Sequence, residues 1–127
     1  MLIFARLLET QGDIKKLTKE EKNLAKDAKN YMDRMYSRDI RIQDVAGILH
    51  VHPNYLSTLF RREYDQSPRE YLRKVRMNQA KILLTTTEYS ISDISSDVGY
   101  TNPFQFSKVF KSCYGISPTE YRNMRQV

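Results

Sequence analysis

The 127-residue sequence has one cysteine, two histidines and no tryptophan. Cys113 has no second cysteine with which to form a disulfide inside the chain, and one cysteine with two histidines cannot supply the four ligands of a structural zinc site. We therefore expect a protein of the reducing cytoplasm that holds no metal and no cofactor. Glycine and proline number only four each, which disfavours both disorder and a β-rich fold.

Long apolar runs are also absent. The start of the chain, Met1–Leu8, is apolar but short, with no basic leader and no small-residue cleavage site, so we expect neither a signal peptide nor a membrane span. The apolar run over residues 2–8 ends at a loop-like stretch, residues 9–13. Two interpretations stay open: residues 1–18 are the tail or linker of an absent upstream domain, or the apolar stretch folds onto the helices behind it.

Charge is unevenly balanced, with 21 Lys plus Arg against 15 Asp plus Glu, a formal net charge of +6 and a pI near 9.5. Such a balance suits a polyanionic partner without identifying one.

What the sequence does contain is a repeat of 50 residues. The pairs that match at this offset are Pro53/Pro103, Ser57/Ser107, Phe60/Phe110, Tyr64/Tyr114, Ser67/Ser117, Pro68/Pro118, Glu70/Glu120 and Tyr71/Tyr121. Units near 40 residues seldom hold a core alone, so the two copies should lean on a shared element. The stretch from Ser67 to Leu84 is the candidate, because its apolar residues lie on more than one side, as in a helix enclosed by several neighbours.

The remaining periodicity is helical throughout, so we predict an all-α fold. Thr18 and Glu21 form a capping-box pattern before a helix over 19–37, whose apolar face is Leu24, Ala28, Tyr31 and Met35. Two helix-turn-helix units, 19–66 and 87–127, are then joined by a long connecting helix, 67–86, with residues 19–37 as an extra N-terminal helix. Ser67 and Glu70 should cap the connecting helix, with Pro68 in its first turn, and a last short helix should follow Ser117.

The two copies differ at one turn. Their first helices match at an offset of 49 (Ile42/Ile91) and their second helices at 50, so the turn 99–102 should hold one extra residue. Arg41 stands where the second copy has Ser90, and because arginine is a poor N-cap, we predict a frayed start to the helix at Ile42.

The second helix of the first unit begins near Pro53 and turns Leu56, Leu59 and Phe60 inward. Polar residues on its other side are of the types that read base edges or hold phosphates in a major groove. These candidates are Asn54, Ser57, Thr58, Arg61 and Arg62. The alternative is an ordinary solvated face. His50 and His52, in the turn, are predicted to be solvated.

In the second unit, Phe106, Val109 and Phe110 should face inward. The outward candidates are Phe104, Gln105, Ser107, Lys108 and Lys111. Phe104 could contact a thymine methyl group or fold beside Tyr100 as core, and the core interpretation is favoured. Cys113 is expected to be a small packing residue. On the connecting helix, Arg76 and Lys81 could brace the units or touch a phosphate, and the pattern does not choose.

The chain closely resembles the AraC/XylS family of bacterial transcription regulators over about residues 38–124, and the family signature is densest in the second unit. The signature is carried by Ile91-Ser92-Asp93-Ile94, Val98-Gly99-Tyr100, Phe106-Ser107-Lys108-Val109-Phe110-Lys111 and Gly115-Ile116-Ser117-Pro118-Thr119-Glu120-Tyr121-Arg122. This resemblance implies two recognition helices in successive major-groove segments of double-stranded DNA. It also implies an upstream effector-binding domain in a larger protein, with RNA polymerase as a candidate partner and no membrane. Ser95 and Phe104 depart from the family pattern.

Spacing agrees with this expectation, since about sixteen helical residues span ~24 Å, and the packed units would bring the recognition helices to the ~34 Å of one DNA turn. Three rivals remain. A helical adaptor without DNA specificity shares the periodicity, although it does not need short polar residues on both outward faces. An enzyme is disfavoured, because the sequence has no Gly-rich phosphate loop and no paired inward carboxylates. A DNA-repair activator with a methyl-accepting cysteine is opposed by the packing position expected for Cys113.

Overall fold

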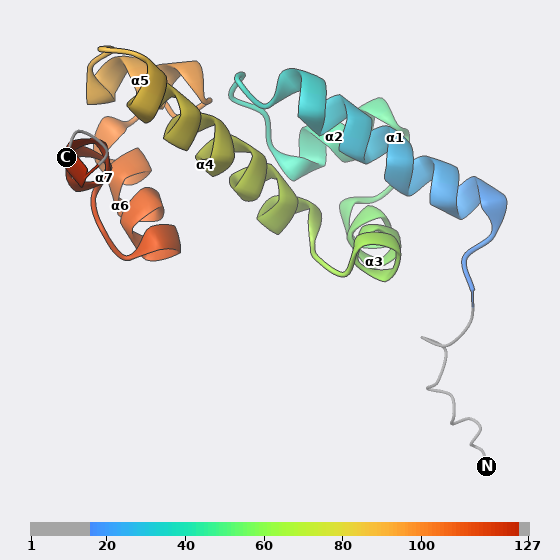
Figure 1. The fold of residues 1–127 in the computed structure, drawn as a ribbon. Coiled ribbons are helices and arrows are strands. Elements are labelled where there is room, and N and C mark those ends of the chain that lie inside the picture. Colours follow the sequence, from blue (N-terminus) through green and yellow to red (C-terminus); the bar gives the residue numbers. More distant parts are fainter. Residues whose placement is uncertain (1–15, 125–127) are drawn as a thin grey trace.

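The computed structural model describes residues 16–124, and all of its regular structure in that range is helical (Figure 1). The helices are α1 (Lys19–Met35), α2 (Ile42–Ile48), α3 (Pro53–Tyr64), α4 (Pro68–Thr86), α5 (Ile91–Asp97), α6 (Pro103–Tyr114) and α7 (Pro118–Met124). The all-α prediction is confirmed. The apolar stretch 2–8 lies outside the described residues. Among the described helices, none is both long and apolar enough to cross a membrane.

Hydrogen bonds at the helix starts follow the predicted capping residues. The Thr18 hydroxyl accepts from the Glu21 N–H at 3.1 Å, and the Glu21 carboxylate accepts from the Thr18 N–H at 2.8 Å. Ser67 and Glu70 make the same reciprocal pair at 3.1 and 2.7 Å. At Arg41 the arginine accepts no capping bond, but the Asp44 carboxylate accepts from its backbone N–H at 2.8 Å. Asp44 thus binds the backbone of Arg41, while no side chain at residue 41 caps the unpaired N–H groups at the start of α2.

One helix end differs from the prediction, because α1 ends at Met35 rather than near residue 37. α4 ends at Thr86, the predicted end of the connecting helix. The hydroxyls of Thr85 and Thr86 donate to backbone carbonyls one turn earlier, at 3.1 and 2.7 Å. Such back-bonding lets β-branched threonines remain in the last helical turn.

The fold has two hydrophobic cores, and α4 contributes to both. The first core contains Ala25, Ala28, Met32, Val45, Ala46, Leu56, Phe60 and Leu72. The second contains Met77, Ala80, Leu84, Ile94, Val98, Phe106 and Phe110. The prediction that the connecting helix joins two undersized cores is confirmed. Ile82, however, is 52% exposed, so this residue does not belong to the enclosed faces of α4.

α1 is an integral part of the first unit rather than an addition to it. It packs against α2, α3 and α4. Its buried residues are Ala25, Ala28 and Met32, whereas Leu24 and Tyr31 of the predicted stripe are only partly buried beside that core. The buried face of α1 is therefore rotated relative to the predicted face, and Ala28 belongs to both. The buried positions of α1 have the same 3-and-4 spacing as Met77, Ala80 and Leu84 of α4.

The 50-residue repeat is also a repeat of aromatic packing. In the first unit, the ring of Phe60 lies 4.7 Å from that of Tyr64 and 5.7 Å from that of Tyr71. In the second unit, Phe110 lies 4.7 Å from Tyr114 and 5.7 Å from Tyr121. Equal centroid distances in both units show that α3–α4 and α6–α7 are joined in the same way.

Candidate nucleic-acid interface

Each unit contains two helices joined by a short turn. Residues 49–52 connect α2 to α3, and residues 98–102 connect α5 to α6. The second turn is therefore one residue longer, as predicted from the offsets. It contains Gly99 with φ +99°, a left-handed conformation that favours glycine. The first turn contains His50 with φ +60°.

A side chain in each turn fixes the start of the following helix. His52 Nδ1 accepts from the Asn54 N–H at 3.1 Å. Asn102 Oδ1 accepts from the N–H groups of Phe104 and Gln105 at 2.8 and 3.3 Å. His52 is exposed, but it is a helix cap and not only a solvated turn residue. Both caps orient the first turn of a candidate recognition helix, which is the turn that contacts base edges in helix-turn-helix proteins.

The outer side of α3 holds the candidates of the first unit. Asn54, Thr58, Arg61 and Arg62 are exposed, Ser57 is half-buried, and the predicted inward residues are buried. The Thr58 hydroxyl donates to the Asn54 carbonyl at 3.0 Å, so it faces a partner only with its remaining lone pairs and methyl group. Arg61 lies 4.0 Å from the Glu70 carboxylate, with both side chains largely exposed. Such a pair is weak enough to release the arginine to a phosphate.

The outer side of α6 holds the candidates of the second unit. Gln105, Lys108 and Lys111 are exposed and Ser107 is half-buried. Phe104 is 85% exposed, so the favoured core interpretation is wrong. Phe104 stands in the first turn of α6, and it is Phe106 that packs against Tyr100, with ring centroids 5.8 Å apart.

Cys113 is exposed, so the packing role predicted for it is wrong. Near the end of α6 the core is closed by Tyr114 and Tyr121, both of which pack against Phe110. Cys113 therefore remains in solvent, as does Glu63 at the equivalent position of α3. Because Cys113 is exposed, the packing position expected for it no longer opposes a methyl-accepting cysteine.

The two outward faces are cationic and lie in different units of the fold. α3 carries two arginines and one glutamate, and α6 carries two lysines and no acidic residue. In Figure 1, α3 lies at one end of α4 and α6 near the other. The sequence candidates are thus placed in two separate groups rather than in one cluster.

Two cations of α4, Arg76 and Lys81, have structural contacts. Arg76 is buried, and its guanidinium donates to the carbonyls of Tyr36 and Arg38. It therefore braces the units rather than reaching outward to a phosphate. Lys81 Nζ lies 4.5 Å from the ring centroid of Tyr114, a cation–π contact that braces the second unit.

The chain is similar to known helix-turn-helix proteins. A family model described as a helix-turn-helix domain matches residues 45–124. The chain is 38% identical over 110 residues to the raffinose operon transcriptional regulatory protein RafR of Pediococcus pentosaceus, covering 87% of this chain and 39% of that protein. It is 36% identical over 101 residues to the arabinose operon regulatory protein of Escherichia coli, covering 79% of this chain and 35% of that protein.

A solved structure agrees. The C-terminal domain of AraT, a response regulator from Geobacillus stearothermophilus, superposes with a TM-score of 0.79 at 36% identity, over 82% of this chain and 87% of that one. The chain belongs to the AraC family. It spans less than two fifths of the length of the two operon regulators, so it corresponds to one part of such a protein.

Sequence reasoning missed several residues of this AraC-family domain that position the interface. The caps His52 and Asn102 stand directly before Pro53 and Pro103. Asparagine before a helix-starting proline is a recognisable N-cap signal, whereas a histidine cap has no comparable pattern. The contacts of Arg76 with Tyr36 and Arg38 had no signal, because their acceptors are backbone carbonyls.

Proposed function

We propose that this chain is the DNA-binding part of a larger AraC-family transcription regulator and that it binds two neighbouring boxes of double-stranded DNA. α3 would enter the major groove at one box and α6 at the next. The observation that carries the proposal is the pair of equivalent helices near opposite ends of α4, each capped at its first turn and each with an exposed polar and cationic side.

The length of α4 is consistent with this arrangement. Its 19 residues correspond to about 28 Å, longer than the ~24 Å expected from the sequence. Packed units at both ends bring the recognition helices to about the 34 Å of one DNA turn. One chain could thus contact two boxes on one face of the duplex. Two contacts are needed, since a single small module buries only about 600–1,000 Å².

The outward side chains divide by chemistry into three kinds of contact. Asn54 and Gln105 have amides that can pair with adenine in the major groove. The half-buried Ser57 and Ser107 are short and allow each helix a close approach. Phe104 offers an apolar surface for a thymine methyl group. The cations suited to phosphate or guanine, with the partly engaged hydroxyl, are Arg61, Arg62, Lys108, Lys111 and Thr58.

The proposal extends to the whole regulator. The relatives are more than twice as long as the matched region, which supports an additional, effector-binding domain in the full protein. RNA polymerase is a candidate partner of that protein at a promoter. We further propose a cytoplasmic location and no enzymatic activity, in line with relatives named as operon regulators. No observation favours the alternative of a helical adaptor.

Selection from random duplexes tests the proposal. The chain is bound to a random library at two salt concentrations and the retained DNA is sequenced. We expect one motif with two boxes about one helical turn apart, and affinity that falls with salt as phosphate counterions are released. Salt-sensitive binding without any motif would reduce the protein to a non-specific basic domain.

Variants of the two helices then test whether both bind DNA. Arg61→Ala should weaken contacts in one box and Lys108→Ala in the other, each lowering the salt slope by about 0.9 if one phosphate contact is lost. Lys26→Ala is the control, because it removes the same charge from an exposed position on α1 and leaves both candidate recognition helices unchanged. If Lys108→Ala behaves like this control, then α6 does not hold the DNA at that position and the two-box proposal fails.

A further inference from the structure

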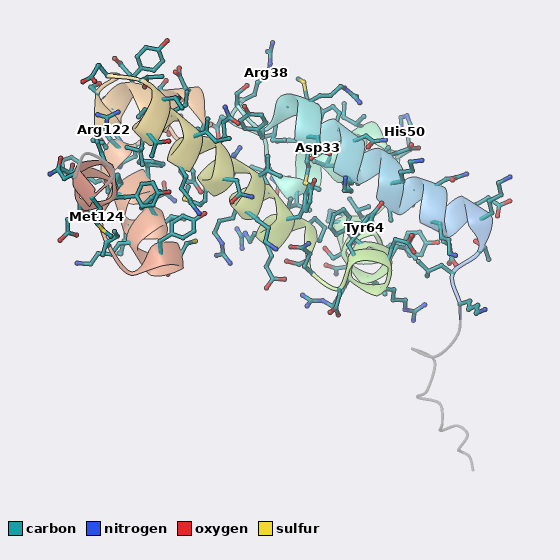
Figure 2. The ribbon with its side chains drawn as sticks, viewed as in Figure 1. Asp33, Arg38, His50, Tyr64, Arg122 and Met124 are labelled. Atoms are coloured by element: carbon teal, nitrogen blue, oxygen red, sulfur yellow. The ribbon has the colours of Figure 1, made fainter. Side chains whose placement is uncertain are left out.

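A buried arginine lies where the two units meet. Arg76, in the middle of α4, is only 9% exposed. Its Nε donates to the Tyr36 carbonyl at 2.9 Å, and its terminal nitrogen donates to the Arg38 carbonyl at 2.8 Å. Both acceptors belong to the segment that follows α1 in the first unit, and Figure 2 shows Arg38 at that end of α1.

The same guanidinium contacts the second unit. Its central carbon lies 5.4 Å from the ring centroid of Tyr100, in the turn before α6. The neighbouring Gly99 is so close that an added Cβ would lie 2.4 Å from the Tyr36 carbonyl oxygen and 2.8 Å from Arg76 Nε. Arg76 is thus enclosed by backbone of the first unit on one side and by the second helix-turn-helix turn on the other.

This junction differs in kind from the rest of the packing. Within the first unit α1, α2 and α3 pack against one another, and in the second unit α6 packs against α5 and α7; α4 packs against α1 and α3 of the first unit and α5 and α7 of the second. A single helix fixes distance along its axis but resists bending and twisting less well. A contact between residues 36–38 and 99–100, placed off that axis and held by a charged donor, restrains those motions.

We propose that Arg76 is the positioning residue that fixes α6 relative to α3 and thereby sets the separation of DNA boxes that the chain accepts. This inference rests on the proposed two-box function. Arg76 is buried away from the outward faces, so it acts through the orientation of the units and not by touching DNA. Without it, each unit keeps its own core, but the pair explores a wider range of relative orientations.

Affinity as a function of box spacing tests this role. The DNA is the two-box duplex selected by the wild-type chain, with companions in which the spacing is one or two base pairs longer or shorter and in which either box is scrambled. Arg76→Met removes the donors at similar volume, and Arg76→Lys keeps a charge and at least one donor. Arg73→Met is the matched control, because Arg73 is exposed on the same helix.

We expect Arg76→Met to weaken binding at the native spacing roughly tenfold, the scale of one charge-assisted hydrogen bond. Its affinity for a single box should match that of the wild type, and its preference for native over altered spacing should fall towards one. Arg76→Lys should be intermediate. Arg73→Met should preserve the spacing preference even if its overall affinity changes.

Three outcomes would overturn the proposal. The first is a wild-type spacing preference in folded Arg76→Met, or in Arg76→Lys if the methionine variant does not fold. The second is an equal loss of affinity for single boxes, which would show that Arg76 supports the fold of one unit only. The third is the same flattening in Arg73→Met. A wild-type chain that selects no two-box motif would instead refute the proposed function itself.

Discussion

Phe104 makes the sharpest prediction about base preference. It is 85% exposed at the start of α6, and its backbone N–H is bound by the Asn102 cap. If its ring covers a thymine methyl group in the second box, replacing that thymine by deoxyuridine removes only the methyl group. Burial of one such group contributes about 0.8 kcal/mol, so wild-type affinity should fall about fourfold.

Four measurements of affinity separate this contact from other effects. Wild type and Phe104→Ala are each titrated with the thymine and the deoxyuridine duplex, for example by fluorescence anisotropy. The wild type should lose about fourfold and the variant should not respond to the replacement. As a control, thymines of the first box are replaced in turn. There Asn54 holds the position equivalent to Phe104, so the sensitivity should not depend on residue 104.

Two results would refute this account of Phe104. One is that no thymine in the second box is sensitive to loss of its methyl group. The other is that Phe104→Ala remains as sensitive as the wild type. The stability of the variant is a separate check, because removal of an exposed ring should change the free energy of unfolding by less than about 0.5 kcal/mol; a larger loss would show that the ring is packed.

Three further changes test the fold around these faces. Ser67→Ala should lower the free energy of unfolding by about 1 kcal/mol, since it removes the acceptor at the start of α4; chemical denaturation measures this, and no change would show that the cap is dispensable. The hydrogen bond from the Ser67 backbone lowers the pKa of Glu70 below 4.5, so its contribution is complete above that unfolded value and is lost as pH falls through the lower folded value. Glu70→Gln should keep the capping bond yet lose this share of acid sensitivity, and equal acid sensitivity in both proteins would contradict the assignment. Cys113 should react with iodoacetamide in the folded protein at a rate close to that in denaturant, and strong protection would show that it is covered.

The elements that could be predicted from the sequence are those with local or periodic causes. Thr18 with Glu21 and Ser67 with Glu70 satisfy helix starts through residues three apart, so the pattern contains the whole interaction. The repeat pairs Phe60 with Phe110, and the two rings have the same aromatic neighbours at the same distances. Family membership came from the same kind of dense local pattern in the second unit.

Burial at single positions was less predictable because it depends on which neighbour occupies a space. Phe104 could have packed beside Tyr100, but Phe106 already holds that place. Cys113 lies on the side of α6 that periodicity would turn inward, yet Tyr114 and Tyr121 close the core there and leave Cys113 exposed. For Arg76, the deciding acceptors are carbonyls about 40 residues earlier, and every residue type has a carbonyl. The contacts of the outward candidates with DNA remain predictions.

α4 is the element in which these two kinds of constraint meet. It supplies Leu72 to the first core and Met77 to the second, so the residues between them set both the distance and the angle between the units. One inserted residue would add only about 1.5 Å but would rotate the second core face by about 100°, moving it away from α5 and α7 or turning α6 off the DNA-facing side. Box separation in this chain therefore cannot be adjusted by small changes in helix length. Adjustment is left to side chains at the junction, where Arg76 holds the two units together without belonging to the hydrophobic core of either.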